Sequence, residues 1–104
     1  MNTVKYTAQL DGSITATIYS PTGNIQNLTG CEIELRLARE YEDNVIITKQ
    51  MTVNDTSCTT IFTPTDTEML EKGNYIIQLI IVDVLGKRNA TEKQKILIDD
   101  ILGV

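Results

Sequence analysis

The side chains that carry most enzyme chemistry are scarce in this sequence. It contains no histidine, which removes the commonest general base near neutral pH and the commonest transition-metal ligand. Serine-histidine and cysteine-histidine catalysis are therefore excluded in their usual forms. Two cysteines, Cys31 and Cys58, cannot complete a zinc site unless carboxylates or a second chain contribute. We expect no metal and no other cofactor.

Carboxylates are the remaining groups that could act in pairs. Two acidic groups stand out, one of Glu40, Glu42 and Asp43 and one of Asp99 and Asp100. Each falls in an expected connection or at a chain end, whereas a glycosidase holds two carboxylates across a cleft. Loop oxygens would suit calcium, but no loop has the alternating Asp and Asn ladder of a calcium-binding loop. We expect solvated acidic loops and no enzyme, with a small hydrolase using Glu40 or Asp43 as the weakest alternative.

The two cysteines lie on different expected strands. A disulfide between Cys31 and Cys58 is geometrically allowed, but their spacing in the sequence cannot establish it. The alternative is two small buried hydrophobic side chains, which is how free cysteine usually behaves. The sequence leaves both possibilities open.

The formal net charge of the chain is −5. Binding to nucleic-acid phosphates draws much of its affinity from clustered Lys and Arg, and Lys87-Arg88 is the only basic doublet. No apolar run is long enough to cross a bilayer, and residues 1–5 lack the core of a signal peptide. We expect neither a nucleic acid nor a membrane as partner, and synthesis in a cytoplasm.

Alternating apolar residues divide the chain into expected strands. These cover residues 3–10, 14–18, 31–39, 45–52, 56–63, 74–83 and 90–99. Thr65 and Glu68 have the spacing of a capping box, which predicts one short helical turn within residues 65–71. Seven short strands with at most one helical turn predict a single all-β antiparallel sandwich domain over residues 1–104.

The strand expected over residues 74–83 is apolar on both faces. One set of alternate positions would face the core: Tyr75, Ile77, Leu79 and Ile81. The other face would then carry three apolar side chains, interrupted by Gln78: Ile76, Ile80 and Val82. A lone antiparallel sandwich usually places polar side chains there. This second face is either covered by flanking loops and strands or is an assembly interface.

A short apolar tail is a further candidate for an interface. It consists of Ile101, Leu102 and Val104 at the end of the chain. Either this tail or the second face of residues 74–83 could supply a patch that is buried on assembly.

The segment Glu71-x-Gly73-x-Tyr75 resembles the tyrosine corner of immunoglobulin-like domains. In that motif, a tyrosine near the start of the sixth strand hydrogen-bonds back to upstream backbone. Ile77 stands where an antibody domain has its second cysteine, and the chain has no tryptophan. The likeness is therefore to prokaryotic or viral immunoglobulin-like modules, and it implies structural roles for Gly73 and Tyr75.

Two segments carry a second resemblance, which covers nearly the whole chain. Residues 23–33, Gly-Asn-Ile-Gln-Asn-Leu-Thr-Gly-Cys-Glu-Ile, are similar to a G-x-x-x-D-L-T-G-A-x-V passage, with Asn27 and Cys31 as departures. Residues 72–91 are similar to a G-E-Y strand, a D-x-x-G-K-R hairpin and an S-T start of the last strand. These passages belong to the immunoglobulin-like N-terminal domain of upper baseplate proteins of phages that infect Gram-positive bacteria, which the chain resembles.

That resemblance implies a non-enzymatic virion structural protein, made in the bacterial host cytoplasm, that docks on capsid, tail or baseplate subunits. Members of the family usually continue into further segments that hold the receptor-binding protein, whereas this chain stops after one domain. The alternatives are a tail or baseplate adaptor and a small domain that decorates capsids or forms a fibre base. In either case a homo-oligomer or a high copy number would let weak contacts act together.

A carbohydrate-binding or adhesion module is the alternative from another class. Such a module would recognise a cell-surface glycan through loops at one end of the sandwich. Lectin sites commonly place sugars against aromatic side chains. Tyr19 and Tyr41 are the only tyrosines near expected loops.

Overall fold

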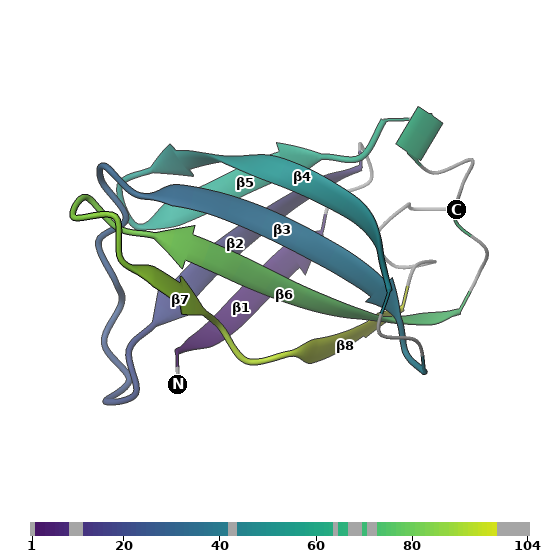
Figure 1. The fold of residues 1–104 in the computed structure, drawn as a ribbon, viewed down its shortest axis with the longest axis horizontal. Helices are drawn as coiled ribbons and strands as arrows, with labels where there is room; N and C mark the ends of the chain where they lie inside the picture. The colour runs from purple at the N-terminus through teal and green to yellow at the C-terminus, as the bar shows by residue number, and fades with distance from the viewer. Residues whose placement is uncertain are drawn as a thin grey trace.

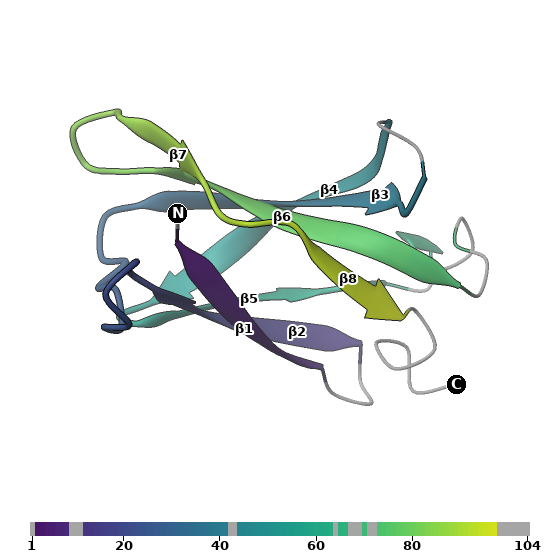
Figure 2. The same ribbon diagram turned by 90° about the horizontal axis from the view of Figure 1, so that it is seen from below.

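The computed structural model describes residues 2–8, 12–41, 44–63, 65–66, 70 and 73–97. Within them lie the strands β1 (Thr3–Ala8), β2 (Ser13–Tyr19), β3 (Glu32–Arg39), β4 (Val45–Asn54), β5 (Ser57–Ile61), β6 (Asn74–Val82), β7 (Arg88–Ala90) and β8 (Gln94–Leu97). All their pairings are antiparallel. Figure 2 shows two layers, with β1, β2 and β5 in one and β3, β6, β7 and β8 in the other. The predicted all-β antiparallel sandwich is confirmed.

Strand β4 belongs to both layers (Figure 1). Its residues from Val45 to Met51 pair with β3, and Thr52 to Asn54 pair with β5. The β3–β4 register shifts between Leu37 and Ala38, and such irregularities increase the local twist of a strand pair. The resulting order, β1-β2-β5-β4-β3-β6-β7, is that of an immunoglobulin-like sandwich.

The core lies between the layers and is mainly aliphatic. On β3 and β6, alternate side chains are buried as the sequence predicts: Ile33, Leu35, Leu37, Tyr75, Ile77, Leu79 and Ile81. Leu35 and Leu79 are register partners across β3 and β6. Full burial of one such side chain contributes about 1.5–3 kcal/mol, so this central pair of strands carries much of the stability.

The predicted tyrosine corner lies where β6 begins. Gly73 has φ +146, a backbone conformation that side chains with a Cβ rarely adopt. Tyr75 follows two residues later and is only 2% exposed. Its hydrogen bond to upstream backbone stays a prediction, but its position at the start of the strand is the one expected.

The sequence predicts one last strand over residues 90–99, whereas the structure divides it into β7 and β8. The division falls at Thr91, which is fully buried. The Thr91 amide donates to the carbonyl of Leu79 (3.0 Å), and the Thr91 hydroxyl accepts from the amide of Leu79 (3.1 Å). The freed carbonyl of Thr91 accepts from Nε2 of Gln78 (2.9 Å). The Thr91 hydroxyl thus takes the place of a backbone carbonyl as the acceptor for the Leu79 amide, because a buried backbone amide needs a hydrogen-bond partner.

The same interruption joins the two layers at their open side. The amide of Glu92 donates to the carbonyl of Asn2 (3.1 Å). Nε2 of Gln94 donates to the carbonyl of Val4 (2.5 Å). Both acceptors belong to the β1 segment in the other layer, and Figure 2 shows β1 beneath the β7–β8 link. These bonds give partners to two backbone carbonyls at the β1 edge of its layer, which an unpaired edge strand would otherwise leave exposed.

The predicted helical turn is present in part, but its cap differs from the prediction. Thr65 and Asp66 are helical, and Glu68, the predicted capping partner of Thr65, lies outside the described residues. The observed cap joins Thr63 and Asp66: the Thr63 hydroxyl accepts from the Asp66 amide (3.3 Å), and Oδ2 of Asp66 accepts from the Thr63 amide (2.8 Å). Nζ of Lys49 also lies 2.9 Å from Oδ2 of Asp66. This contact with β4 anchors the cap two residues earlier than predicted.

Thr91→Val should destabilise the domain by about 1–3 kcal/mol, because valine has the same shape but leaves the buried Leu79 amide without its acceptor. Thr91→Ser keeps the hydroxyl and should cost less. Urea unfolding followed by far-UV circular dichroism measures both free energies of unfolding. A smaller loss for Thr91→Val than for Thr91→Ser would show that the methyl group, not the hydrogen bond, is what stabilises this position.

Asp66→Asn should lower stability at pH 7 by about 1 kcal/mol, a typical value for a capping residue. The hydrogen bond from Lys49 and that from the Thr63 backbone hold the pKa of Asp66 below its ordinary value. The stabilisation is therefore present above about pH 4, the usual unfolded pKa, and is lost as the pH falls through the folded pKa.

Urea unfolding of wild type and Asp66→Asn at pH 7 and pH 2.5 checks this expectation. The difference between the two proteins should shrink at the lower pH. In a Lys49→Met background it should already be smaller at pH 7. A difference that is constant with pH contradicts the assignment.

Candidate functional site

The two outer faces of the sandwich differ in chemistry. On the layer of β1, β2 and β5, the outer face is rich in threonine: Thr7, Thr15 and Thr59 form one cross-strand row. The hydroxyls of Thr15 and Thr59 lie 3.2 Å apart. Ile61, which is 53% exposed, is an apolar side chain among these polar ones in the described part of this face. A largely polar outer face is usual for an antiparallel sheet in water.

The outer face of β3, β6 and β7 is patterned in stripes, and we call it the striped face. Strand registers place the apolar side chains of β6 between Glu32, Glu34 and Arg36 on β3 and Arg88 on β7. Val82 lies between Glu32 and Arg88, and Ile80 lies beside Glu34. The second apolar face predicted for this strand is therefore an outer face of the sandwich.

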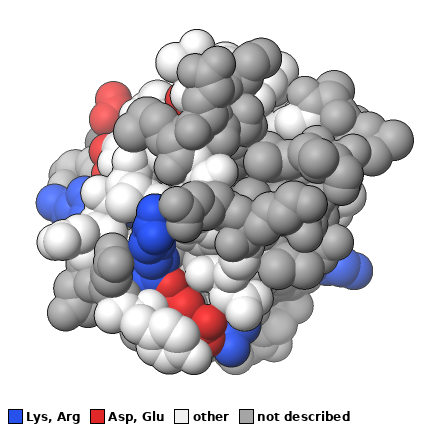
Figure 3. All heavy atoms as spheres, turned by 90° about the vertical axis from the view of Figure 1, so that its right-hand side faces the viewer, with Lys and Arg blue, Asp and Glu red and all other residues white. Residues whose placement is uncertain are grey.

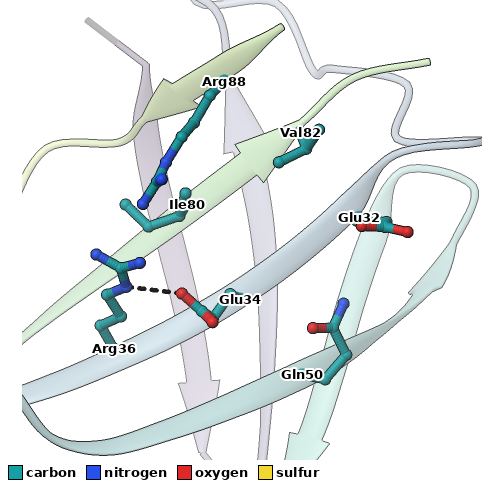
Figure 4. A pocket seen from close by; sticks show the side chains of 7 residues that line it. All are labelled: Glu32, Glu34, Arg36, Gln50, Ile80, Val82 and Arg88. Atoms are coloured by element: carbon teal, nitrogen blue, oxygen red, sulfur yellow. Dashed lines mark hydrogen bonds and ion pairs between the residues drawn. The ribbon is translucent and has the colours of Figure 1, made fainter. Parts of the chain in front are cut away.

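Long neighbouring side chains cover the centre of this apolar row. Figure 4 shows Ile80 between Arg88 on one side and Glu34 and Arg36 on the other. Ile80 is only 9% exposed, whereas Ile76 and Val82 are half-buried. The sequence left open whether this face is covered by neighbouring elements or accessible for an interface. In the structure, side chains of the neighbouring strands cover the middle of the apolar row and leave its ends accessible.

A shallow hollow of about 200 Å³ lies on the striped face. It is lined by Glu32, Glu34, Arg36, Gln50, Ile80, Val82 and Arg88 (Figure 4). A second hollow, of about 380 Å³, lies around Ile76 and is lined also by Lys93, Val45 and Gln78. Mixed apolar and charged walls of this kind suit contact with another protein surface.

Ion pairs neutralise some of the charges on this face. Nε of Arg36 lies 2.7 Å from Oε2 of Glu34, and Nζ of Lys95 lies 2.5 Å from Oε1 of Glu40. The Glu40 carboxylate raises the pKa of Lys95. Among the described residues, Glu32 and Arg88 take part in no ion pair. One unpaired acid and one unpaired base therefore flank Val82.

Of the acidic residues considered for catalysis, the structure describes Glu40. Glu40 is paired with Lys95, and the other four acidic residues named above lie outside the described part of the chain. Cys31 and Cys58 are both free, so the disulfide is not formed. Burial raises the pKa of the Cys58 thiol to about 11, which leaves it un-ionised and a weak nucleophile near pH 7. Within the described residues, no group of three His, Cys, Asp or Glu could hold a metal ion.

The tyrosines considered for sugar binding lie at opposite ends of the sandwich. Tyr19 ends β2 at the end of the sandwich where residues 20–31 lead into β3, and Tyr41 follows the far end of β3. Tyr41 is 92% exposed. At the Tyr19 end, a hollow of about 280 Å³ has both apolar and polar side chains in its lining, and the polar ones include Gln26, Asn27 and Asn89. The loops therefore offer amides at one end but no pair of aromatic side chains.

The other end of the sandwich, seen in Figure 3, carries acidic and basic groups side by side. The described surface on that side shows no broad area of a single charge sign in this view. The predicted interface residues Ile101, Leu102 and Val104 lie outside the described residues. Whether this tail forms an interface stays a prediction.

The β6–β7 hairpin carries an apolar tip that the sequence reasoning missed. Val84 is 70% and Leu85 is 90% exposed. Their signal in the sequence is an apolar pair directly before Gly86, at a turn where polar residues are usual. A Cβ at Gly30 would lie 2.5 Å from Cγ1 of Val84, so the tip packs closely against the segment that precedes β3.

The fold defines the class of this protein as an antiparallel β-sandwich with the strand order of immunoglobulin-like domains. A scan against protein-family models and searches of curated proteins and of solved structures find no match. In the described ranges, no helix has the length and hydrophobicity to span a membrane.

Ile80→Ala should destabilise the domain by about 2 kcal/mol, because it removes a covered aliphatic side chain and leaves a cavity under Glu34 and Arg88. Ile61→Ala makes the same change at an exposed position and should cost about 0.5 kcal/mol or less. Urea unfolding at low protein concentration measures both. Two equally small losses would mean that the neighbouring side chains do not cover Ile80 in solution.

Proposed function

We propose that this chain is a non-enzymatic virion structural protein of a bacteriophage that docks on other virion subunits through the striped face. One observation carries the proposal most directly: the central strand β6 has apolar side chains on its outer face, while the opposite outer face is rich in threonine. Half-buried apolar residues flanked by charged ones are typical of the core and rim of protein interfaces.

The sequence motifs support the choice of a virion. The passage at residues 23–33 and the hairpin at residues 82–91 resemble those of phage baseplate immunoglobulin-like domains. In the structure these two segments meet, because Gly30 lies against Val84. The resemblance supports an assembly role at the baseplate or tail, and a capsid decoration or fibre-base role is the alternative location.

Quantitative mass spectrometry of purified particles from the source tests the proposal. The chain should be present, at a ratio near that of the major capsid protein for head decoration, or at a few to a few dozen copies for a tail or baseplate part. Absence of the wild-type chain from particles would overturn the virion assignment.

Val82→Asp should reduce incorporation into particles at least about tenfold, because it places a carboxylate beside Glu32 at an accessible end of the apolar row. Ile61→Asp is the matched control on the opposite outer face, and it should be incorporated like the wild type. Circular dichroism of both purified variants checks that each is folded. Equal incorporation of the two variants would exclude the striped face as the docking surface.

A glycan-binding module is the second candidate function. The observation in its favour is the hollow lined by Gln26, Asn27 and Asn89, because side-chain amides readily bond to sugar hydroxyls. Binding of the purified chain to cell walls of the host, lost on Asn89→Ala and unaffected by Val82→Asp, would support this function. The separation of Tyr19 and Tyr41 makes it the weaker of the two.

A further inference from the structure

The unpaired charges of the striped face are complementary to those of a second, identical face. Glu32 lies on one side of β6 and Arg88 lies on the other, each as the register neighbour of Val82. Arg36 and Lys95 are already paired with acids of the same chain. Glu32 and Arg88 have no ion-pair partner among the described residues, although both stand beside a half-buried apolar side chain.

We infer that the partner of the striped face is the striped face of a second copy, related by a two-fold axis parallel to β6. This inference rests on the proposed function in taking the striped face as a contact surface. Such an axis turns the sheet over and exchanges its two sides, so that β3 of one copy lies over β7 of the other. Glu32 then faces Arg88 of the other copy twice, and the two Val82 side chains meet between these pairs.

The direction of the axis follows from the order of the charges. A two-fold axis perpendicular to β6 in the same plane would place β3 over β3 and β7 over β7. Glu32 would then lie over β3 of its copy, where Arg36 is already paired with Glu34, and Arg88 would lie over β7, which carries no acid. Neither unpaired charge would gain an opposite charge, and like charges across an interface are unfavourable. The axis parallel to β6 is the face-to-face arrangement that pairs opposite charges, and aligned stacking of this kind is common between sheets.

The size of the face predicts a weak contact. With β4 counted beside β3, and β7 continued by β8 beside β6, the sheet presents four strand positions. At about 4.8 Å between strands and about eight residues of about 3.3 Å each, they cover roughly 500 Å² in each copy. Two such faces bury roughly 1,000 Å², near the lower limit for a specific interface. We therefore expect a reversible dimer whose population depends on protein concentration. In an assembly with many copies, such contacts would act together.

Charge reversal tests the pairing directly. The dimer contains two equivalent contacts between Glu32 of one copy and Arg88 of the other. Glu32→Arg alone places two bases at each of these contacts, and Arg88→Glu alone places two acids there. Each should weaken the dimer at least about tenfold in dissociation constant. Lys5→Glu is the control, a charge reversal on the outer face of the other layer, and it should leave the dimer unchanged.

Two combinations should restore association. The double variant Glu32→Arg/Arg88→Glu regains opposite charges within its own dimer. An equimolar mixture of the two single variants should associate although neither does so alone, because each supplies the charge that the other lacks. Sedimentation velocity over a wide range of protein concentrations measures all six samples: wild type, the two single variants, the Lys5→Glu control, the double variant and the mixture. Added salt should weaken the wild-type dimer.

The inference is overturned if the wild type is monomeric at every concentration, or if neither the double variant nor the mixture regains association. Particle incorporation separates that failure from failure of the proposed function. A monomeric wild type together with selective loss of Val82→Asp from particles would mean that the face binds a different virion protein. A monomeric wild type whose Val82→Asp variant is incorporated normally would exclude both the dimer and the striped face as the docking surface.

Discussion

The pair of hydrogen bonds between Thr91 and Leu79 is the interaction on which the edge of this sandwich depends. The buried hydroxyl accepts from the Leu79 amide, so the last strand can be interrupted without leaving that amide unpaired. The interruption directs the chain toward β1, where Glu92 and Gln94 bond to the other layer. It also explains the polar residue on the outer face of β6, because Gln78 bonds to the freed carbonyl of Thr91.

Alternation of apolar residues was sufficient to predict the strands, because an inward side chain at every second position is a local property of the chain. It could not predict the interruption at Thr91, since a threonine is common in strands and nothing near it in the sequence shows that its hydroxyl bonds to Leu79. The cap at Thr63 was missed for a related reason. Asp66 is fixed by Lys49, which is 17 residues away.

The same limit applies to the candidate site: features within one strand were predictable from the sequence, whereas contacts between strands were not. The sequence predicted that Ile76, Ile80 and Val82 share a face, because that depends on the two-residue period of one strand. It could not predict that Ile80 is covered, since the covering side chains come from β3 and β7. The flanking of Val82 by Glu32 and Arg88 likewise depends on the register of strands that are far apart in the chain.

The sharing of β4 between both layers has a consequence for how the domain folds. Each sheet needs this strand: β3 pairs with its first part and β5 with its last three residues. Neither sheet can therefore be completed while the other is absent, and a half-formed sandwich has no stable edge. Folding and unfolding should be cooperative for the whole domain, and slow for its size because β2 must find β5 and β3 must find β6 across long stretches of chain.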